Sequence, residues 1–472
     1  MKGSLQIKAI ITFFLAILLL FKIFILSGCA VIIPPSGGPR DTLPPVLVSA
    51  NPHDSTLNFH GNRIVFTFDE YIDLADVQNN LLFQPTPEKN PVITSKLRTL
   101  TIRLRDTLIP NTTYTFNFGN AIRDVNEANV LKNFTYVFST GPKMDTGQYS
   151  GKVVIAENGA IDTTIIVGLY RDMTDSAVIK KKPNYVTRVD RNGNFRFRNM
   201  PPDSFAIYAL GDAGLTRRYQ NKTQLFAFAD HPVIIGKSEP VLLYAYREQP
   251  KKENRPAPAA PVPGKVTVNE KRLQFTTNLT GNQLDLLGDL VLNFQTPLKT
   301  VDSTKISLTS DSSFTPVRYT IQLDSTKSEL RFKTNWKENT FYNLILAKDF
   351  AADTLGKQLL KADTVSFYTK KLSDYGNLTI RVRKLDTSLN PVLQFVQGEK
   401  VMYSVPIKSG IYSTKLFLPG DYDLRVLYDR NGNNKWDPGQ FFGRKKQPEV
   451  AIPLSKKISV KPAWDNEFEV SL

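Results

Sequence analysis

Hydrophobic positions along this chain follow two different patterns. Residues 9–25 are almost wholly apolar, with Lys22 as the one charge among them. After residue 45, apolar and polar residues alternate in short runs, which is the two-residue period of strands with one buried face. Clear examples are Arg63–Phe68, Thr99–Leu104, Thr113–Phe118 and Thr135–Ser139. Since no stretch beyond residue 29 sustains a 3.6-residue period, the pattern predicts an all-β body.

Turn residues and proline-rich segments divide these runs into modules. Asn, Asp, Pro and Gly separate the expected strands, and short strands with frequent turns are typical of β-sandwiches. Residues 30–45 are rich in Pro and Gly and cannot form a long helix or a central strand, so they predict a tether. Residues 249–264 predict a semi-extended linker that divides the remaining chain nearly in half.

The two halves resemble each other, which predicts an A-B-A′-B′ repeat of four sandwiches in two pairs. The expected correspondences, first half before second half, are Arg63–Phe68 with Asp289–Phe294, Thr135–Thr140 with Thr364–Thr369, Pro202–Ile207 with Pro419–Leu424, and His231–Ile235 with Gln447–Ile452.

The first 29 residues have the parts of a secretory signal. Lys2 and Lys8 occur without an acid before the apolar run, and Leu26-Ser27-Gly28-Cys29 follows it. The run of 17 residues is short for the roughly 20 that a comfortable membrane span needs, which favours a cleaved signal over an anchor helix. Leu-Ser-Gly-Cys resembles the lipobox of bacterial lipoproteins. This resemblance implies cleavage before Cys29 and its acylation with fatty acids such as palmitate.

Charge and cysteine content narrow the class of protein. The formal net charge is +16 and falls to +13 without residues 1–28, while Cys29 is the single cysteine, so no disulfide supports the domains. The densest basic runs, Lys180–Lys182 and Arg444–Lys446, lie in no helical or zinc-finger context, so we expect no nucleic-acid partner. Two interpretations stay open: a solvated face, or attraction to anionic lipid headgroups or an acidic partner.

Several short motifs resemble a family of envelope proteins. Cys29 followed by Pro35–Pro45, Asn51-Pro52 and Phe66–Tyr71 is similar to Bacteroidota lipoproteins with an N-terminal SbsA-type bacterial Ig-like domain. The B blocks resemble prealbumin-like or carboxypeptidase-regulatory-like sandwiches. The resemblance implies attachment to the outer membrane and no known catalysis. Some lipoproteins of this kind are thought to be accessory parts of outer-membrane assembly or export machinery.

Pattern and resemblance together predict seven segments. They are a signal peptide (1–28), a lipidated tether (29–43), an Ig-like domain A (44–142), a prealbumin-like domain B (147–247), a linker (248–264), a second Ig-like domain A′ (265–371) and a second prealbumin-like domain B′ (374–472).

A recurring triplet of Asp, Ser or Thr, and a small or apolar residue resembles the O-glycosylation acceptor of the same phylum. The alternative is ordinary turn chemistry, since Asp and Ser or Thr side chains bond their own backbone. The two interpretations are compatible. The acceptor hydroxyls would be those of Thr42, Ser55, Thr107, Thr163, Ser176, Ser303, Ser325, Thr354 and Thr364.

The sharpest local motif is the Asn-rich loop, Asp429–Asp437. Oxygen-bearing side chains at Asp429, Asn431, Asn433 and Asp437 recur at alternating positions, which suits a hard cation such as Ca²⁺. However, the glycine does not occupy its EF-hand position, and only two of these residues carry charge. A plain hairpin loop, in which Asn and Gly supply positive φ, is the favoured alternative.

Catalytic candidates are few. Asp69, Glu70, Asp73 and Asp76 form an acidic group that suits either acid/base chemistry or, as favoured here, a solvated turn. The three histidines, His53, His60 and His231, have no Cys or Asp at ligand spacing. Motifs of serine hydrolases, zinc proteases and P-loop proteins do not occur, so we expect no enzyme and no resident cofactor.

The sequence therefore predicts an outer-membrane lipoprotein that acts as a non-catalytic scaffold and binds other envelope proteins. A glycan-binding module with Trp436 as its exposed aromatic is one alternative, and a carboxylate hydrolase built on Asp69 and Glu70 is another. Which side of the outer membrane the body faces stays open. The apolar residues after Cys29 lack an acidic export signal, which favours the periplasm.

Overall fold

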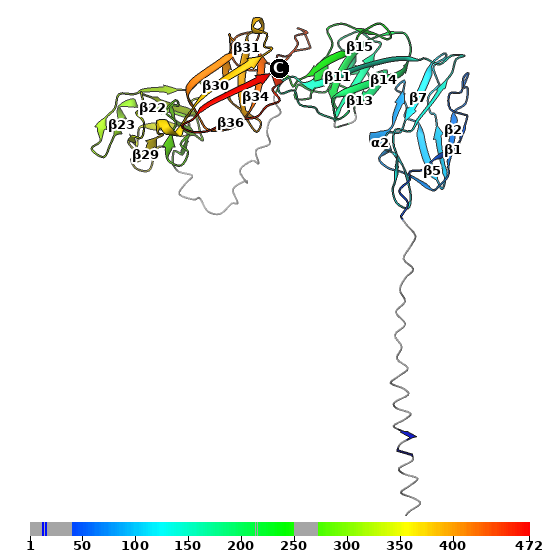
Figure 1. Cartoon of the computed structure of the whole chain (residues 1–472), viewed down its shortest axis with the longest axis horizontal. Helices are drawn as coiled ribbons and strands as arrows, with labels where there is room; N and C mark the ends of the chain where they lie inside the picture. Colours follow the sequence, from blue (N-terminus) through cyan, green and yellow to red (C-terminus); the bar gives the residue numbers. More distant parts are fainter. Residues whose placement is uncertain (1–11, 14, 17–39, 213, 215, 250–271) are drawn as a thin grey trace, which may run out of the picture. The chain divides into compact units, whose positions relative to one another are not determined.

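The computed structural model describes residues 12–13, 15–16, 40–212, 214, 216–249 and 272–472 (Figure 1). The predictions for the signal peptide, for Cys29 and for most of the linker lie outside these residues. Within them, the helices are all too short or too polar to cross a bilayer. The described chain forms two compact units: one holds residues up to Pro142 except Gln84–Thr86 and Thr112–Tyr114, and the other holds the remainder.

Domain A is built mainly from antiparallel strands, with sheet orders β1-β2-β6-β5, β10-β7-β4 and β3-β8-β9. Alternation along β2 and β6 buries Phe66, Phe68, Leu100 and Ile102 on one face. The bounds are β1 Leu47–Asn51, β2 Arg63–Phe68, β3 Ile72–Leu74, α2 Val77–Asn80, β4 Leu82–Gln84, β5 Val92–Lys96, β6 Thr99–Arg103, β7 Thr113–Asn117, β8 Ile122–Asp124, β9 Val130–Leu131 and β10 Thr135–Ser139.

Domain B is a sandwich of two sheets, β14-β11-β18 and β13-β12-β15-β16, and β17 also pairs with β15. Strands β11 and β18 run parallel, and the other pairs are antiparallel. The bounds are β11 Gly147–Ile155, β12 Ile165–Tyr170, α3 Ala177–Lys180, β13 Tyr185–Arg188, β14 Asn194–Met200, β15 Ser204–Gly211, β16 Phe226–Phe228, β17 Val233–Ile234 and β18 Val241–Ala245.

Domain A′ repeats the four-strand sheet of domain A as β19-β21-β26-β25 and adds sheets β20-β29-β27-β23-β24 and β22-β28. The bounds are β19 Phe275–Thr277, β20 Gln283–Leu284, β21 Leu290–Phe294, β22 Leu298–Val301, η2 Ser303–Lys305, β23 Ile306–Ser310, β24 Thr315–Pro316, β25 Thr320–Leu323, β26 Glu329–Lys333, β27 Phe341–Leu346, β28 Ala351–Asp353, β29 Asp363–Thr369 and η3 Leu372–Asp374.

Domain B′ repeats the topology of domain B strand by strand, with sheets β33-β30-β37 and β32-β31-β34-β35, β36 pairing with β34, and β30 parallel to β37. The bounds are β30 Gly376–Arg383, η4 Thr387–Leu389, β31 Pro391–Gln397, β32 Lys400–Pro406, β33 Ile411–Phe417, β34 Gly420–Tyr428, β35 Val450–Pro453, β36 Ile458–Val460 and β37 Asp465–Ser471.

The all-β prediction with an A-B-A′-B′ repeat of sandwiches is confirmed. One predicted correspondence is wrong. The sequence pattern pairs residues 447–452 with residues 231–235, but β35 is the neighbour of β34, as β16 is the neighbour of β15. The counterpart of β17 is β36, because each makes a short second pairing with the start of the long strand. The two segments share similar Pro-Val-Ile and Pro-Glu-Val-Ala-Ile patterns, because short alternating strands at different places in a sandwich have similar composition.

Candidate functional site

Strand β12 is buried on both faces, and this marks the main contact surface inside the second unit. Its inward residues Ile165, Val167 and Leu169 belong to the core of domain B. Its outward residue Tyr170 is also buried and packs edge-on against Tyr208 of β15, with ring centroids 5.4 Å apart. The outward face of this sheet is therefore covered rather than solvated.

A segment of domain B′ between β34 and β35 covers this face of the domain B sheet. Phe441 is only 3% exposed, and its ring centroid lies 5.4 Å from that of Tyr208, 5.1 Å from Phe226 and 4.8 Å from Phe228. Phe442 extends the contact to Tyr219, at 5.4 Å. We call residues 438–449, together with the surface they cover, the B–B′ clamp.

Polar contacts fix the clamp in register. The Ala451 amide donates to the Ala156 carbonyl at 2.8 Å, so the free edge of β35 bonds to domain B. The Gln447 side chain donates to the Phe228 carbonyl at 3.0 Å and to Asp230 Oδ1 at 2.9 Å. Gly439 leaves room for Tyr246, because a Cβ there would lie 2.6 Å from the tyrosine ring. Domains B and B′ thus form one packed body.

The Asn-rich loop, Asp429–Asp437, directly precedes the clamp segment in the chain. Asp429 is 1% exposed, and its carboxylate accepts the backbone N–H groups of Asn431, Gly432 and Asn434 at 3.1, 2.8 and 2.6 Å. Asp212, at the same place in domain B, also accepts two backbone N–H groups. The buried aspartate therefore closes the turn after the long strand in both domains.

Glu449 closes the other side of the loop. It is 1% exposed, and its two oxygens accept the N–H groups of Arg430 and Asp437 at 2.8 and 3.0 Å. Burial raises the pKa of Glu449 above its ordinary value. The indole N–H of Trp436 donates to the Glu449 carbonyl at 2.7 Å, so three contacts hold the loop to the start of β35.

The predicted Ca²⁺ ligands are brought together, and each of the four side chains accepts at least one N–H group of the protein. Asp437 Oδ2 accepts the side-chain amides of Asn431 and Asn433, at 2.5 and 2.8 Å. No group of three or more His, Cys, Asp or Glu side chains is placed to hold a metal among the residues that the structure describes. Binding of Ca²⁺ by this loop stays a prediction.

Trp436 is not the exposed aromatic that a glycan platform requires. It is half-buried and packs against a small cluster of Val392, Leu427 and Ala451. A groove of about 500 Å³ does lie between domains B and B′, with Tyr149, Tyr244 and Arg430 among its walls. Tyr149 is buried, and Trp436 does not line the groove. The residue that motivated the glycan hypothesis thus has a packing role.

Three of the four acidic residues of the group in domain A are held by neighbouring donors. Asp69 is exposed and accepts the Val46 N–H at 2.8 Å, and Asp76 accepts the Asn79 amide. Asp73 pairs with Arg123 at 2.7 Å, and this contact lowers the pKa of Asp73.

Glu70 differs from the other acids of this group because it is half-buried. Its pKa is raised by partial burial and by the nearby Asp124 carboxylate. Asp124 is itself engaged by the backbone N–H groups of residues 127–129. The three histidines, His53, His60 and His231, are exposed. The turn interpretation is therefore favoured over acid/base chemistry.

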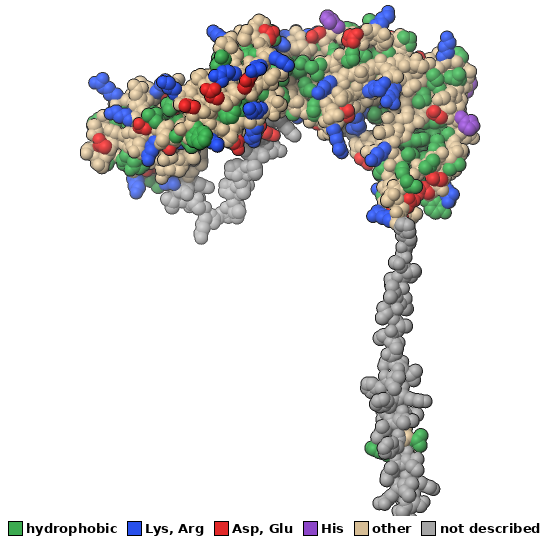
Figure 2. All heavy atoms as spheres, in the orientation of Figure 1, with side chains coloured by type: hydrophobic (Ala, Val, Ile, Leu, Met, Phe, Trp, Pro, Cys, Tyr) green, Lys and Arg blue, Asp and Glu red, His purple; other side chains and the backbone are tan. Residues whose placement is uncertain are grey.

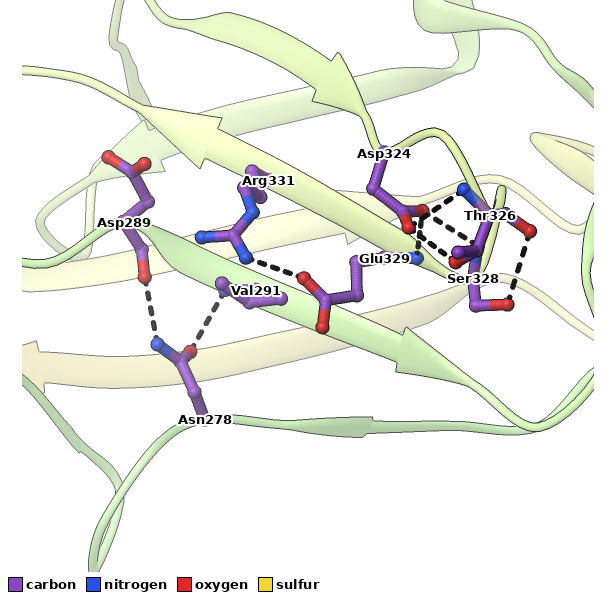
Figure 3. Close-up of polar contacts among 8 residues, drawn as sticks. All are labelled: Asn278, Asp289, Val291, Asp324, Thr326, Ser328, Glu329 and Arg331. Carbon is purple, nitrogen blue, oxygen red and sulfur yellow. Dashed lines mark hydrogen bonds and ion pairs between the residues drawn. The ribbon is translucent and has the colours of Figure 1, made fainter. Parts of the chain in front are cut away.

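The predicted O-glycosylation acceptors lie at the surface, and their aspartates form turns. Eight of the nine acceptor residues are exposed, and Ser176 is partly exposed. In five triplets the Asp carboxylate accepts the backbone N–H two residues later. Figure 3 shows one case, in which Asp324 receives the N–H groups of Thr326, Ser328 and Glu329 at the β25–β26 hairpin. Turn chemistry accounts for these aspartates, and modification stays a prediction.

Sequence reasoning missed Gly439, Phe441 and Phe442, the residues that join the two domains. A signal was present. Residues 165–170 form a continuous apolar run, which is typical of a strand buried on both faces. Two adjacent phenylalanines in an otherwise polar segment after the Asn-rich loop offered a second one.

Comparison with known proteins identifies the first domain only. Residues 41–140 match the family of the bacterial Ig-like domain, which is less than half of the chain. No curated protein matches. The SbsA-type and Bacteroidota assignments stay predictions.

Solved structures with some similarity come from several bacteria. Domains MG0-NIE-MG1 of Escherichia coli alpha-2-macroglobulin are 14% identical over 39% of this chain and 71% of that chain, with a TM-score of 0.20. The Bacillus anthracis TIE protein is 11% identical over 93% and 75%, with a TM-score of 0.18. BcpA, the major pilin subunit of Bacillus cereus, is 9% identical over 69% and 98%, with a TM-score of 0.16. TM-scores this low support no argument about function.

Proposed function

We propose that this protein is a lipid-anchored, non-catalytic scaffold of the bacterial envelope. The observation that carries the proposal is the B–B′ clamp. It joins two sandwiches into one body through residues that lie more than 200 positions apart in the sequence, with Phe441 at the centre. A scaffold must hold its binding surfaces at fixed positions, and a buried aromatic interface with backbone hydrogen bonds supplies that rigidity.

A second junction supports the same proposal. Tyr375, which precedes β30, donates its hydroxyl to Asp285 at 2.7 Å and accepts the Leu286 N–H at 2.8 Å. Burial and the hydrogen bond to Asp285 raise the pKa of Tyr375, so the hydroxyl keeps its proton at neutral pH. Domain A′ is thereby tied to domain B′ by a group that does not titrate under ordinary conditions.

Edge strands are the contact sites that such a scaffold would offer to partners. β32 pairs with β31 and with no second strand of the described sheet, and it exposes Val401 and Met402. An unpaired edge with apolar side chains can add a strand from another protein. The expected partners are outer-membrane or other envelope proteins, including assembly or export machinery, and no nucleic acid.

The anchor in this proposal is Cys29, acylated at the outer membrane. The match of residues 41–140 to a bacterial Ig-like domain supports the part of the family resemblance that adjoins this cysteine. Attachment through several acyl chains would be stable, whereas one chain alone holds marginally.

Purification from membranes tests the scaffold. Tagged protein, solubilised in mild detergent, should be recovered with one or more envelope proteins in a ratio that stays constant through a second purification step. The Phe441→Ala variant should recover less partner, because it loosens the B–B′ clamp. Phe314→Ala, at a position that is 54% exposed, is the matched control and should recover the usual amount. Recovery of the protein alone would overturn the proposal.

A further inference from the structure

The two densest basic runs of the sequence meet on one surface. Lys181 pairs with Asp172 at 2.6 Å, and Lys445 pairs with Asp175 at 2.9 Å. Both aspartates belong to the loop between β12 and α3. The run at Lys180–Lys182 and the run at Arg444–Lys446 therefore approach the same loop, although more than 260 residues separate them in the sequence.

A third segment joins them. The Tyr219 N–H donates to the Val178 carbonyl of α3 at 2.9 Å, and the Tyr219 ring lies 5.4 Å from that of Phe442. These contacts bring the backbone at residues 218–219 close to both runs, and Arg218 is exposed. We call residues 171–182, Arg218 and residues 442–446 the basic face.

Charge on the basic face is unbalanced. The face contains two acidic residues, Asp172 and Asp175, and eight basic ones: Arg171, Lys180, Lys181, Lys182, Arg218, Arg444, Lys445 and Lys446. Arg171 pairs with Asp203, which lies outside the face. Figure 2 shows both basic and acidic side chains over the visible surface, so eight bases against two acids is a local excess. A local excess of this kind attracts an anionic surface.

The basic face also contains exposed apolar side chains. Met173 is 42% exposed and Ile179 is 44% exposed, and both lie within the segment that holds the first basic run. Phe442, two residues before the second basic run, is partly exposed. Nucleic acid phosphates gain little from exposed methionine and isoleucine. A bilayer accepts both kinds of side chain, because phosphate groups lie beside the boundary of the acyl region.

We propose that the basic face docks on a membrane that contains anionic lipids. The lysine and arginine side chains contact lipid phosphates, and Met173 and Ile179 enter the headgroup region. The proposal extends beyond the scaffold function and does not depend on Cys29, since the face lies wholly within domains B and B′. Docking would hold this body against a membrane surface in addition to any lipid anchor.

The test uses residues 30–472, which contain every described strand and lack the acylation site. Binding to phosphatidylcholine vesicles with and without phosphatidylglycerol is measured by co-sedimentation at about 0.1 M salt. We expect binding only with phosphatidylglycerol. Each basic residue near such a surface contributes about fivefold in affinity. The triple variant Lys180→Gln, Arg444→Gln, Lys446→Gln should therefore bind about a hundredfold more weakly.

Two further variants make the outcome specific. The control Lys237→Gln, Lys333→Gln, Lys400→Gln removes the same charge from exposed positions elsewhere and should bind within about threefold of the parent. Met173→Ser with Ile179→Ser should lose about tenfold, and the loss should persist at high salt because it is not electrostatic. Thermal unfolding of each variant confirms that the fold is kept.

Several results would overturn the proposal. Equal losses in the two triple variants would show that total charge, rather than the basic face, determines binding. Tighter binding to duplex DNA or polyglutamate than to the vesicles would assign a different class of partner. Release by inorganic phosphate beyond that caused by chloride of equal ionic strength would indicate a small anion site instead of a membrane surface.

Discussion

Replacement of Phe441 by alanine should open the B–B′ clamp without unfolding the domains that it joins. Phe441 is 3% exposed and contacts Tyr208, Phe226 and Phe228 across the interface. Truncation of a buried phenylalanine typically costs about 3–5 kcal/mol. The clamp is a surface contact that relaxes more easily than a domain core, so we take the lower end, about 3 kcal/mol. The substitution should destabilise the interface rather than either domain, because the cores of domains B and B′ do not contain Phe441.

Amide hydrogen exchange measures this opening directly. The Ala451 N–H bonds to the Ala156 carbonyl across the interface, so its exchange reports separation of the two domains. A loss of about 3 kcal/mol corresponds to exchange about a hundredfold faster at Ala451 in Phe441→Ala. Core amides of β12 should keep their parent rates. Phe314→Ala should change Ala451 exchange by less than about threefold, since Phe314 is exposed.

A double-mutant cycle separates the interface from general damage. Phe441→Ala and Phe226→Ala remove rings whose centroids lie 5.1 Å apart, and aromatic pairs of this kind couple by about 0.5–1.5 kcal/mol. Exchange at Ala451 that rises by less than about fivefold in Phe441→Ala would refute the reasoning. The same would follow from an equal effect in Phe314→Ala.

Three further predictions concern the same region. Gly439→Ala should shorten the lifetime of the clamp, seen as faster Ala451 exchange, because the new Cβ would lie 2.6 Å from Tyr246; Gly288→Ala, where the nearest atom is 3.6 Å away, should have no such effect. Asp429→Ala should lower the free energy of unfolding, measured by urea titration, by about 2–3 kcal/mol, because three backbone N–H groups lose their acceptor. Asp429→Asn should cost less. Chelation of Ca²⁺ should leave the parent midpoint unchanged; a clear drop would establish a cation in the Asn-rich loop. The raised pKa of Glu449 means that the folded state binds its proton more tightly, so stability should decline as pH rises from the ordinary glutamate pKa through the raised value, and Glu449→Gln should flatten this slope in urea titrations.

Local pattern was sufficient to predict most of the strands. Arg63–Phe68 and Thr135–Ser139 begin and end as the alternation indicates, because each has one face in the core and one in solvent. The repeat was also visible, since turn residues recur at equivalent places. Register between the halves was harder to assign. β16 and β17 are short strands with similar apolar content, and only their pairing with β15 distinguishes them.

Contacts between distant segments could not be predicted from the alternation. In the sequence, Phe441 is an apolar residue in a loop of domain B′. Its contact partners Phe226 and Phe228 belong to domain B, more than 200 positions away. Likewise, Trp436 and the oxygens of the Asn-rich loop suit a ligand by composition alone. Their actual partners are the Glu449 carbonyl and nearby N–H groups, and these depend on where β35 begins. Long-range packing, rather than local chemistry, decided the role of these residues.

The most direct test of a lipid-anchored scaffold is the intact mass of the protein purified from envelope membranes. We expect a mature chain that begins at Cys29 and carries the added mass of several acyl chains. Cys29→Ser should abolish both the added mass and the release of the signal. A chain that still begins at Met1, or one cleaved elsewhere without lipid, would contradict it.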